Sequence, residues 1–243
     1  MVEKISKTSI IVPAFNEKEG IEKTLVDLSS LLNKNKINYE IIIVDDGSSD
    51  GTIDIVKRIA LKNKNIKLKV RNENPGFGFS LIDGSKNSLG EIILWVMGDS
   101  SDDFNNIPIM INKINQGYDM VIGSRNVPGG SRGDQEILKA FGSKLYSSLA
   151  KILFNLPVYD ITNAFRAFRK ELINKVELEN GDFSISPEFA IKSHVLGYKI
   201  TEIPTSYIDR KVGEAKTKLF RMGAKYYRLL IKYWILNLFN RLV

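Results

Sequence analysis

Along the first half of the chain, short apolar runs alternate with longer stretches in which apolar residues recur every three or four positions. The short runs predict β-strands, and the periodic stretches predict amphipathic helices between them. The predicted strands cover residues 9–12, 40–44, 66–70, 91–97 and 118–123. Strands that alternate with helices are typical of βαβ units, so we predict an α/β fold with a mostly parallel sheet flanked by helices.

Two of the intervening helices are marked clearly. In 19–32 the apolar residues fall on one helical face, and 52–61 follows Asp50, whose side chain predicts a helix cap. No internal repeat or low-complexity linker interrupts the pattern. We therefore predict one domain over residues 1–215, followed by a helical tail over residues 216–243.

Three of the predicted strands end in segments that are rich in acidic and hydroxyl side chains. These segments are 12–17, 44–52 and 97–103. In an open parallel sheet, ligands bind beyond the carboxyl ends of the strands. All three segments are therefore expected on one rim of the sheet, where we place the candidate site.

The third segment carries three carboxylates within five residues, those of Asp99, Asp102 and Asp103. Mg²⁺ and Mn²⁺ prefer hard oxygen ligands and are often held by one or two carboxylates together with substrate phosphates. The alternative is a turn into a helix that begins near Asn105, with Asp102 or Asp103 as its cap.

A second acidic pair, Asp45 and Asp46, follows directly after the predicted strand 40–44. Carboxylates in this place can accept hydrogen bonds from a nucleobase or a ribose. A turn with a helix cap is the alternative, and it accounts best for Asp50 and its neighbours.

Composition narrows the possible chemistry. The 243 residues include no cysteine and a single histidine, His194. Thiolate catalysis, disulfides and zinc clusters are thereby excluded, and a bound metal would need oxygen ligands. His194 lies in a helical pattern, where we expect a structural role. The N-terminal residues lack the apolar core of a signal peptide, which predicts a cytoplasmic protein.

The net charge of +7 is concentrated in the tail. Residues 210–243 contain nine basic residues and one acidic residue, a charge of +8, so the rest of the chain carries −1 and does not indicate nucleic-acid binding. The tail's cations recur at helical spacing, and polar residues interrupt it too often for a bilayer span. We expect it to lie on the cytoplasmic face of an anionic membrane; packing on the body or on a membrane subunit is the alternative.

Taken in order, the motifs of this chain resemble those of family 2 glycosyltransferases, which have the GT-A fold. The segments that carry the resemblance are 11–17, 43–52, 74–79, 99–103, 121–125, 160–168, 202–204 and 210–216. The later segments are similar to those of the branch that makes dolichyl- and polyprenyl-phosphate sugars. The resemblance implies an inverting hexosyltransferase that moves a sugar from a GDP-mannose or UDP-glucose type donor to a polyprenyl phosphate.

The resemblance also implies a set of site residues. Those expected to bind the nucleotide sugar are Pro13, Ala14, Phe15, Glu17, Asp45, Asp46, Gly98 and Asp99. Asp99, with Asp102, is expected to hold Mg²⁺ or Mn²⁺, because Met97 stands where the family has its first acidic ligand. The residues expected to face phosphates are Arg125 and Arg210 during catalysis, and Lys139, Ser143 and Lys216 at the acceptor.

Two further functions stay open. A hydroxyl acceptor on a glycan would need a general base, for which Glu188 is the candidate, although a role at the start of its helix is the alternative. A phosphate acceptor is already anionic and needs no base. Met97 also leaves open a non-catalytic sugar-nucleotide-binding subunit. Pyrophosphorylases and dinucleotide dehydrogenases are disfavoured, because no Gly-rich phosphate loop follows the first strand.

Overall fold

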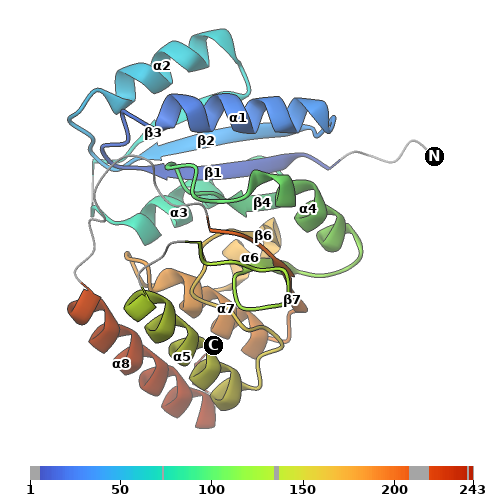
Figure 1. Cartoon of the computed structure of the whole chain (residues 1–243), viewed down its shortest axis with the longest axis vertical. Coiled ribbons are helices and arrows are strands. Elements are labelled where there is room, and N and C mark those ends of the chain that lie inside the picture. The colour runs from blue at the N-terminus through green and yellow to red at the C-terminus, as the bar shows by residue number, and fades with distance from the viewer. Residues whose placement is uncertain (1–5, 73, 134–136, 208–218, 240, 243) are drawn as a thin grey trace.

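The computed structural model describes residues 6–72, 74–133, 137–207, 219–239 and 241–242. Its centre is a seven-stranded sheet with the order β3-β2-β1-β4-β6-β5-β7 (Figure 1). The strands are β1 (Thr8–Ala14), β2 (Tyr39–Asp45), β3 (Ile66–Val70), β4 (Ile92–Trp95), β5 (Met120–Ser124), β6 (Arg166–Arg169) and β7 (Ile200–Pro204). All five predicted strands are present, so this part of the prediction is confirmed.

The sheet is mostly parallel, as predicted. Only β6 runs against its neighbours, pairing antiparallel with β4 on one side and β5 on the other. The strand predicted over 91–97 was too long. The observed β4 ends at Trp95, and the chain then enters the segment with Asp99, Asp102 and Asp103, which we call the acidic loop. The carboxyl ends of β1, β2, β4 and β5 therefore share one rim with the amino end of β6.

Helices cover both faces of the sheet. One face carries α1 (Ile21–Lys34), α2 (Thr52–Lys62) and α4 (Ile107–Asn115). The other carries α3 (Phe77–Lys86), α5 (Ile137–Phe154), α6 (Lys170–Lys175), α7 (Ile185–Val195) and α8 (Leu219–Leu238). Alternate residues of β1 fill the two cores, with Ile10 in one and Ile11 in the other, as the period of a strand requires. The result is a three-layer sandwich (Figure 1).

The connection from β3 into α3 lies in close contact with a second loop. The backbone N–H of Gly78 donates to the carbonyl of Gly181 at 2.8 Å. A Cβ atom on Gly78 would lie 2.2 Å from the carbonyl oxygen of Asn180, and one on Gly76 would lie 2.3 Å from that of Gly181. Glycine is therefore required here by the close approach of two backbones.

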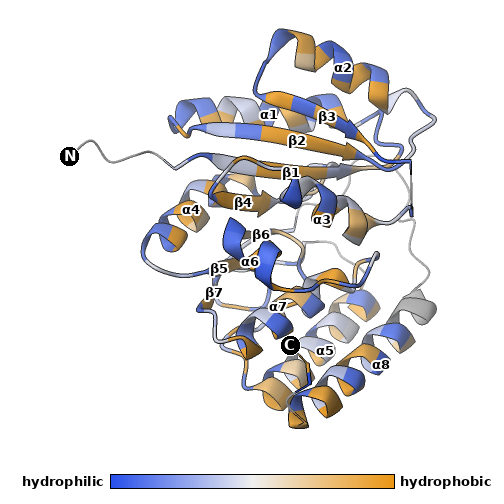
Figure 2. Cartoon of the chain, turned by 180° about the vertical axis from the view of Figure 1, so that it is seen from behind, coloured by the Kyte–Doolittle hydropathy of each residue, from blue (hydrophilic) through white to orange (hydrophobic). Residues whose placement is uncertain are grey.

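The tail forms a helix, α8, which packs beside α5 in both views of the ribbon (Figures 1 and 2). Leu230 and Tyr233 are buried against the body. Lys225 pairs with Asp182 at 2.5 Å at the edge of the helix. The alternative, that the tail packs on the body, thus holds for the side of α8 that carries Leu230 and Tyr233. Among the described helices, none combines the length and apolarity needed to cross a bilayer. The predicted domain boundary at 215/216 lies outside the described residues.

Candidate active site

The loops that follow β1 and β2 are tied together by hydrogen bonds. The backbone N–H of Asn16 donates to Ser48 Oγ at 2.8 Å, and the N–H of Glu17 donates to Thr52 Oγ1 at 2.9 Å. Asn16 has a φ of 53°, a left-handed conformation that asparagine tolerates better than most residues. These bonds hold Pro13, Ala14 and the exposed ring of Phe15 at the rim beside the Asp45 loop.

Asp45 is fully buried at the end of β2. Its Oδ1 accepts hydrogen bonds from the backbone N–H groups of Gly47 and Ser48, at 3.1 and 3.0 Å. Its Oδ2 has no hydrogen-bond partner among the described residues. A buried carboxylate oxygen without a donor is costly, so this atom is suited to a ligand's N–H or O–H.

Asp46 is held on both sides by the protein. Its Oδ1 accepts from Arg71 at 2.7 Å, and its Oδ2 accepts from the backbone N–H of Gly76 at 2.5 Å. Arg71 also bonds to Asp83 at 2.6 Å. Asp46 thus joins the Asp45 loop to the start of α3. Sequence reasoning did not single out Arg71, although its place directly after a rim-ending strand was a usable signal.

The acidic loop after β4 is anchored by a helix. Thr24 on α1 donates to the carbonyl of Gly98 at 2.8 Å, and its Oγ1 lies 2.6 Å from Ser100 Oγ. Ser100 has a φ of 58°, which is uncommon for serine. Asp99 Oδ1 accepts from the backbone N–H of Ser101 at 3.1 Å. Thr24 lies in the helical pattern of α1, where nothing in the sequence indicated this contact.

Asp102 and Asp103 have different roles. Asp103 accepts from the N–H of Asn105 at 3.1 Å and caps the short helix η1 (Phe104–Asn106), as the sequence allowed. Asp102 is 8% exposed, and its Oδ2 accepts from the N–H of Met97 at 2.8 Å. Burial, and then the charge of Asp99, raise the pKa of Asp102 to about 7. Two carboxylates close enough to repel lie where a cation was predicted.

Arg125, at the end of β5, forms a two-pronged ion pair. Its Nε and Nη2 reach the two oxygens of Asp160 at 2.8 and 3.0 Å, and Nη2 also lies 3.2 Å from Thr162 Oγ1. Burial by itself lowers the pKa of Arg125, but the carboxylates of Asp160 and Asp102 raise it above its ordinary value. The acidic loop and Arg125 are therefore electrostatic neighbours.

Ser143 and Arg132 join this cluster from α5 and from the connection before it. Ser143 Oγ lies 2.6 Å from Thr162 Oγ1 and accepts from Arg132 Nη2 at 3.3 Å. Arg132 Nη2 also lies 3.9 Å from Asp160 Oδ2. Burial, reinforced by the charge of Arg125, lowers the pKa of Arg132. The structure thus brings Arg125 and Ser143 together and adds Arg132, which sequence reasoning missed.

The loop that carries Asp160 and Thr162 is bonded to Arg166, another residue that sequence reasoning missed. Its guanidinium is fully buried and donates to the carbonyl oxygens of Ile161 and Asn163. Burial lowers the pKa of Arg166 to about 9. A buried cation bonded to this loop fixes the position of Asp160 and, through it, of Arg125.

The other predicted site residues are placed differently. Lys139 lies one turn before Ser143 on α5 and is partly buried. Glu188 is fully buried in the first turn of α7. Its oxygens accept from the N–H groups of Glu179 and Asn180 at 3.0 Å, and Lys192 pairs with it at 2.9 Å. This carboxylate is engaged structurally, the alternative that the sequence offered for it.

Two predicted phosphate-binding residues, Arg210 and Lys216, lie outside the described residues. Within the described part of the chain, no group of three or more acidic or histidine side chains is gathered for a metal. The protein can therefore offer Asp99 and Asp102 to a cation, and further ligands would have to come from elsewhere.

Comparison with known proteins agrees with this architecture. The model of Glycosyl transferase family 2 matches residues 9–177. The chain is 31% identical to a dolichol-phosphate mannosyltransferase from Pyrococcus furiosus, over 92% of this chain and 64% of that protein. It is 27% identical to an undecaprenyl-phosphate mannosyltransferase from Micrococcus luteus, over 85% of each chain. The chain thus spans less than two thirds of the length of the Pyrococcus relative.

Solved structures with a similar fold include the glucosyl-3-phosphoglycerate synthase of Mycobacterium tuberculosis in complex with Mn²⁺, UDP and glucosyl-3-phosphoglycerate. The TM-score is 0.71 at 20% identity, over 95% of this chain and 79% of that one. The protein described here belongs to glycosyl transferase family 2 and has the GT-A fold.

Proposed function

We propose that this protein is an inverting hexosyltransferase that moves a sugar from a nucleotide-diphosphate donor to a polyprenyl phosphate at a membrane surface. The observation that carries the proposal is the meeting of two groups of opposite charge at one rim. Asp99 and Asp102 lie on one side, and the Arg125–Asp160 pair with Ser143 and Arg132 lies on the other. The mutual effect of Asp102 and Arg125 on their pKa values supports this proximity.

The donor end of the site is formed by the loops after β1 and β2. We place the nucleoside against Pro13, Ala14, Phe15 and Glu17, with the free Oδ2 of Asp45 as an acceptor for one of its donors. Asp46 supports this pocket by fixing the neighbouring loop through Arg71 and Gly76. The donor class, GDP-mannose or UDP-glucose, follows the family resemblance.

A divalent cation, Mg²⁺ or Mn²⁺, fits the acidic loop. The pKa of Asp102 is raised by burial and by its neighbour Asp99, and a hard cation would relieve that repulsion. Asp99 and Asp102 would hold it, together with donor oxygens. When bound, such a cation supplies charge neutralisation for the diphosphate leaving group. Gly98 lets the loop pass close to β1, since a Cβ there would lie 3.1 Å from the Pro13 carbonyl oxygen.

The acceptor end favours an anion over a sugar hydroxyl. Guanidinium groups suit phosphate oxygens, and Ser143 adds a hydroxyl donor beside them. Lys139, Arg210 and Lys216 are the further cations that we assign to this end. An acceptor phosphate can attack the anomeric carbon without a base. A hydroxyl acceptor would need one, and the carboxylate of Glu188 is fully buried and engaged.

A polyprenyl phosphate is held in a bilayer, so the protein has to reach a membrane surface. We assign this contact to the tail, residues 216–243, and place the protein peripherally on the cytoplasmic face. A membrane-protein subunit that binds the tail is the alternative partner.

The experiment that tests the function offers labelled GDP- and UDP-sugars to the protein with polyprenyl phosphate and Mg²⁺ or Mn²⁺. We expect label to enter the organic phase only when polyprenyl phosphate is present. Label in water-soluble glycans would support the hydroxyl-acceptor alternative. Donor binding without any transfer would support the non-catalytic subunit.

The assignment of Asp99 as a metal ligand is tested by two substitutions in the acidic loop. Asp99→Ala is expected to lower metal-dependent turnover by about 100-fold or more, because a ligand of the cation is removed. Asp103→Asn, four residues later, keeps the helix cap and should leave turnover unchanged. Circular dichroism checks that both variants fold. Equal activity of the Asp99→Ala variant and the wild type would remove the assignment.

A further inference from the structure

Apolar side chains gather on the outer surface of two neighbouring helices, α5 and α8. Ten of the eighteen large apolar side chains that are exposed in the described part of the chain belong to this surface. On α5 they are Ile137, Leu138, Phe141, Leu145 and Ile152. On α8 and the residue after it they are Ile231, Trp234, Ile235, Leu238 and Phe239. A contiguous exposed apolar surface of this kind marks a binding face.

The two stripes form one face because both helices bury their opposite sides in the same core. Tyr146 and Ala150 of α5, and Leu230 and Tyr233 of α8, belong to one cluster of buried residues. The ring of Tyr146 lies 5.2 Å from that of Tyr226, so the helices are in direct contact. The exposed stripes of the two helices therefore point away from the same core. Figure 2 shows hydrophobic and hydrophilic residues alternating along both helices.

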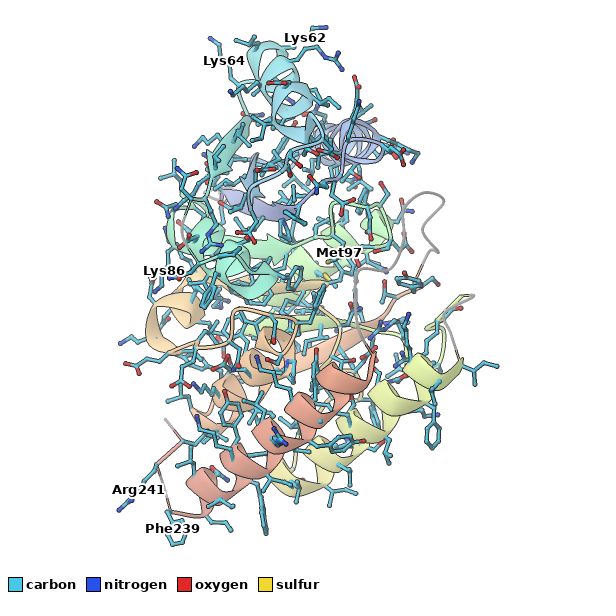
Figure 3. The ribbon with its side chains drawn as sticks, turned by 90° about the vertical axis from the view of Figure 1, so that its left-hand side faces the viewer. Lys62, Lys64, Lys86, Met97, Phe239 and Arg241 are labelled. Carbon is cyan, nitrogen blue, oxygen red and sulfur yellow. The ribbon has the colours of Figure 1, made fainter. Side chains whose placement is uncertain are left out.

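The charges that the two helices themselves bring to this face are positive. Neither the α5 nor the α8 segment contains an acidic residue. Lys144 and Arg228 are exposed on the two helices, and Arg241 is exposed beside Phe239 at the end of α8 (Figure 3). A second copy of this chain would bring two cationic borders together, which is unfavourable. An anionic surface is complementary to both the charge and the apolar character.

We propose that this two-helix face docks on the surface of an anionic membrane, with both helices lying in the plane of the headgroups. The proposal deepens the membrane contact of the proposed function, and it gives α5 as large a share as the tail. Two cations of the tail have a different role in this proposal. Lys225 and Lys232 form ion pairs with Asp182 and Glu179 of the body and so attach α8 to it.

The orientation that follows connects the membrane to the site. Phe141 is exposed on the outer side of α5, whereas Ser143, two residues later, faces Thr162 in the Arg125 cluster. A docked α5 would therefore touch the bilayer with one side and the acceptor phosphate site with the other. A phosphate at the level of the headgroups can reach Ser143 without the lipid tail leaving the membrane.

The first test uses the two tryptophans of the wild-type chain. Trp95 is fully buried in the core, whereas Trp234 is 36% exposed on the proposed face. Adding vesicles of phosphatidylcholine and phosphatidylglycerol should shift the fluorescence emission to the blue, since Trp234 enters the interface. Vesicles of phosphatidylcholine alone should give a smaller shift. An unchanged spectrum with both kinds of vesicle would overturn the proposal.

The second test compares binding of full-length variants to the same mixed vesicles by cosedimentation. The double variant Phe141→Ser and Ile152→Ser should bind at least about 10-fold more weakly, because two apolar side chains no longer enter the interface. The control, Leu61→Ser with Leu89→Ser, changes two exposed apolar residues that lie off this face and should bind as the wild type does. Equal binding by both double variants contradicts the proposal.

The cations are tested in the same way. Arg228→Gln with Arg241→Gln should weaken binding by roughly 10-fold or more. Lys62→Gln with Lys64→Gln removes the same charge at the opposite end of the molecule (Figure 3) and should have little effect. A wild-type dimer in light scattering that the Phe141 and Ile152 changes abolish would assign the face to a second copy instead. None of these assays uses donor or acceptor, so membrane docking and the proposed transfer can fail separately.

Discussion

Arg125 and Arg132 both lie near one buried carboxylate, that of Asp160, at 2.8 and 3.9 Å from its Oδ2. Arg125 donates hydrogen bonds to both carboxylate oxygens of Asp160, and Arg132 donates to the nearby hydroxyl of Ser143. Where the family resemblance places an arginine on α5, this chain has Lys139, which keeps the charge without the planar fork. Arg132 supplies such a fork 3.3 Å from the Ser143 hydroxyl.

We expect Arg132→Gln to raise the KM for polyprenyl phosphate by about 10- to 100-fold, the effect of losing one charge-assisted hydrogen bond. The KM for the nucleotide sugar should change little, because the donor lies at the other end of the site. Arg132→Lys should recover part of the loss. Initial rates with each substrate varied in turn measure both constants.

A matched control for this change is Arg58→Gln. Arg58 forms an exposed ion pair with Glu22 at 2.8 Å on the helices α1 and α2, and such pairs contribute little to stability. Its removal should leave both constants unchanged. An equal rise in the donor KM for Arg132→Gln would show that Arg132 acts on the whole site and not on the acceptor.

At the scale of elements, the site depends on loops that touch each other more than on the strands themselves. Asp46 reaches the start of α3 through Gly76, and Gly78 bonds to the loop before α7. That loop is in turn paired to α8 through Asp182 and Lys225. A change in one of these loops is therefore expected to reach the donor pocket.

Gly78→Ala should destabilise the protein by about 1–3 kcal/mol, because its Cβ would meet the backbone carbonyl of Asn180 at 2.2 Å. The KM for the donor should rise as Asp46 is displaced. Gly142→Ala on α5, where a Cβ meets nothing within 4 Å, should stabilise the helix slightly. Urea denaturation measures both effects. A Gly78→Ala variant as stable as the wild type would mean that the two loops can separate freely.

At the scale of the whole molecule, Glu40 connects four segments of the chain near the amino ends of β1 and β2. Its carboxylate is buried and accepts from Ser9 Oγ, Lys67 Nζ and the backbone N–H of Leu89, each at 2.6 Å. Burial by itself raises the pKa of Glu40, but these donors and the charge of Lys67 lower it to about 2.

Because the folded-state pKa of Glu40 lies below its ordinary value of 4.5, its contribution is complete above pH 4.5 and is lost as the pH falls towards 2. We expect a loss of about 2 kcal/mol in the free energy of unfolding over this window, reduced from the full linkage value because Lys67 is half-exposed. Glu40→Gln should be less stable at pH 6 and should flatten the decline. Urea titrations at several pH values test this, and parallel declines in both proteins would exclude Glu40 as the cause.

The sequence by itself determined the parts of this protein that depend on local pattern. Apolar runs and helical periodicity gave the five strands from β1 to β5 and placed the acidic segments on one rim, because side-chain period and parallel direction follow from backbone geometry. The strands β6 and β7 were not predicted. The four residues of β6 begin and end with arginine, so they form neither an apolar run nor an alternating pattern.

The tertiary structure decided which of the predicted residues meet. Asp160 and Thr162 lie about 35 positions after Arg125, and Thr24 lies 74 positions before Gly98, so no local pattern could join them. It also decided that Glu188 is engaged in the body and that Arg71, Arg132 and Arg166 bond to the loops and side chains of the candidate site. Burial and long-range hydrogen bonding set these roles, and both exist only once the chain has folded.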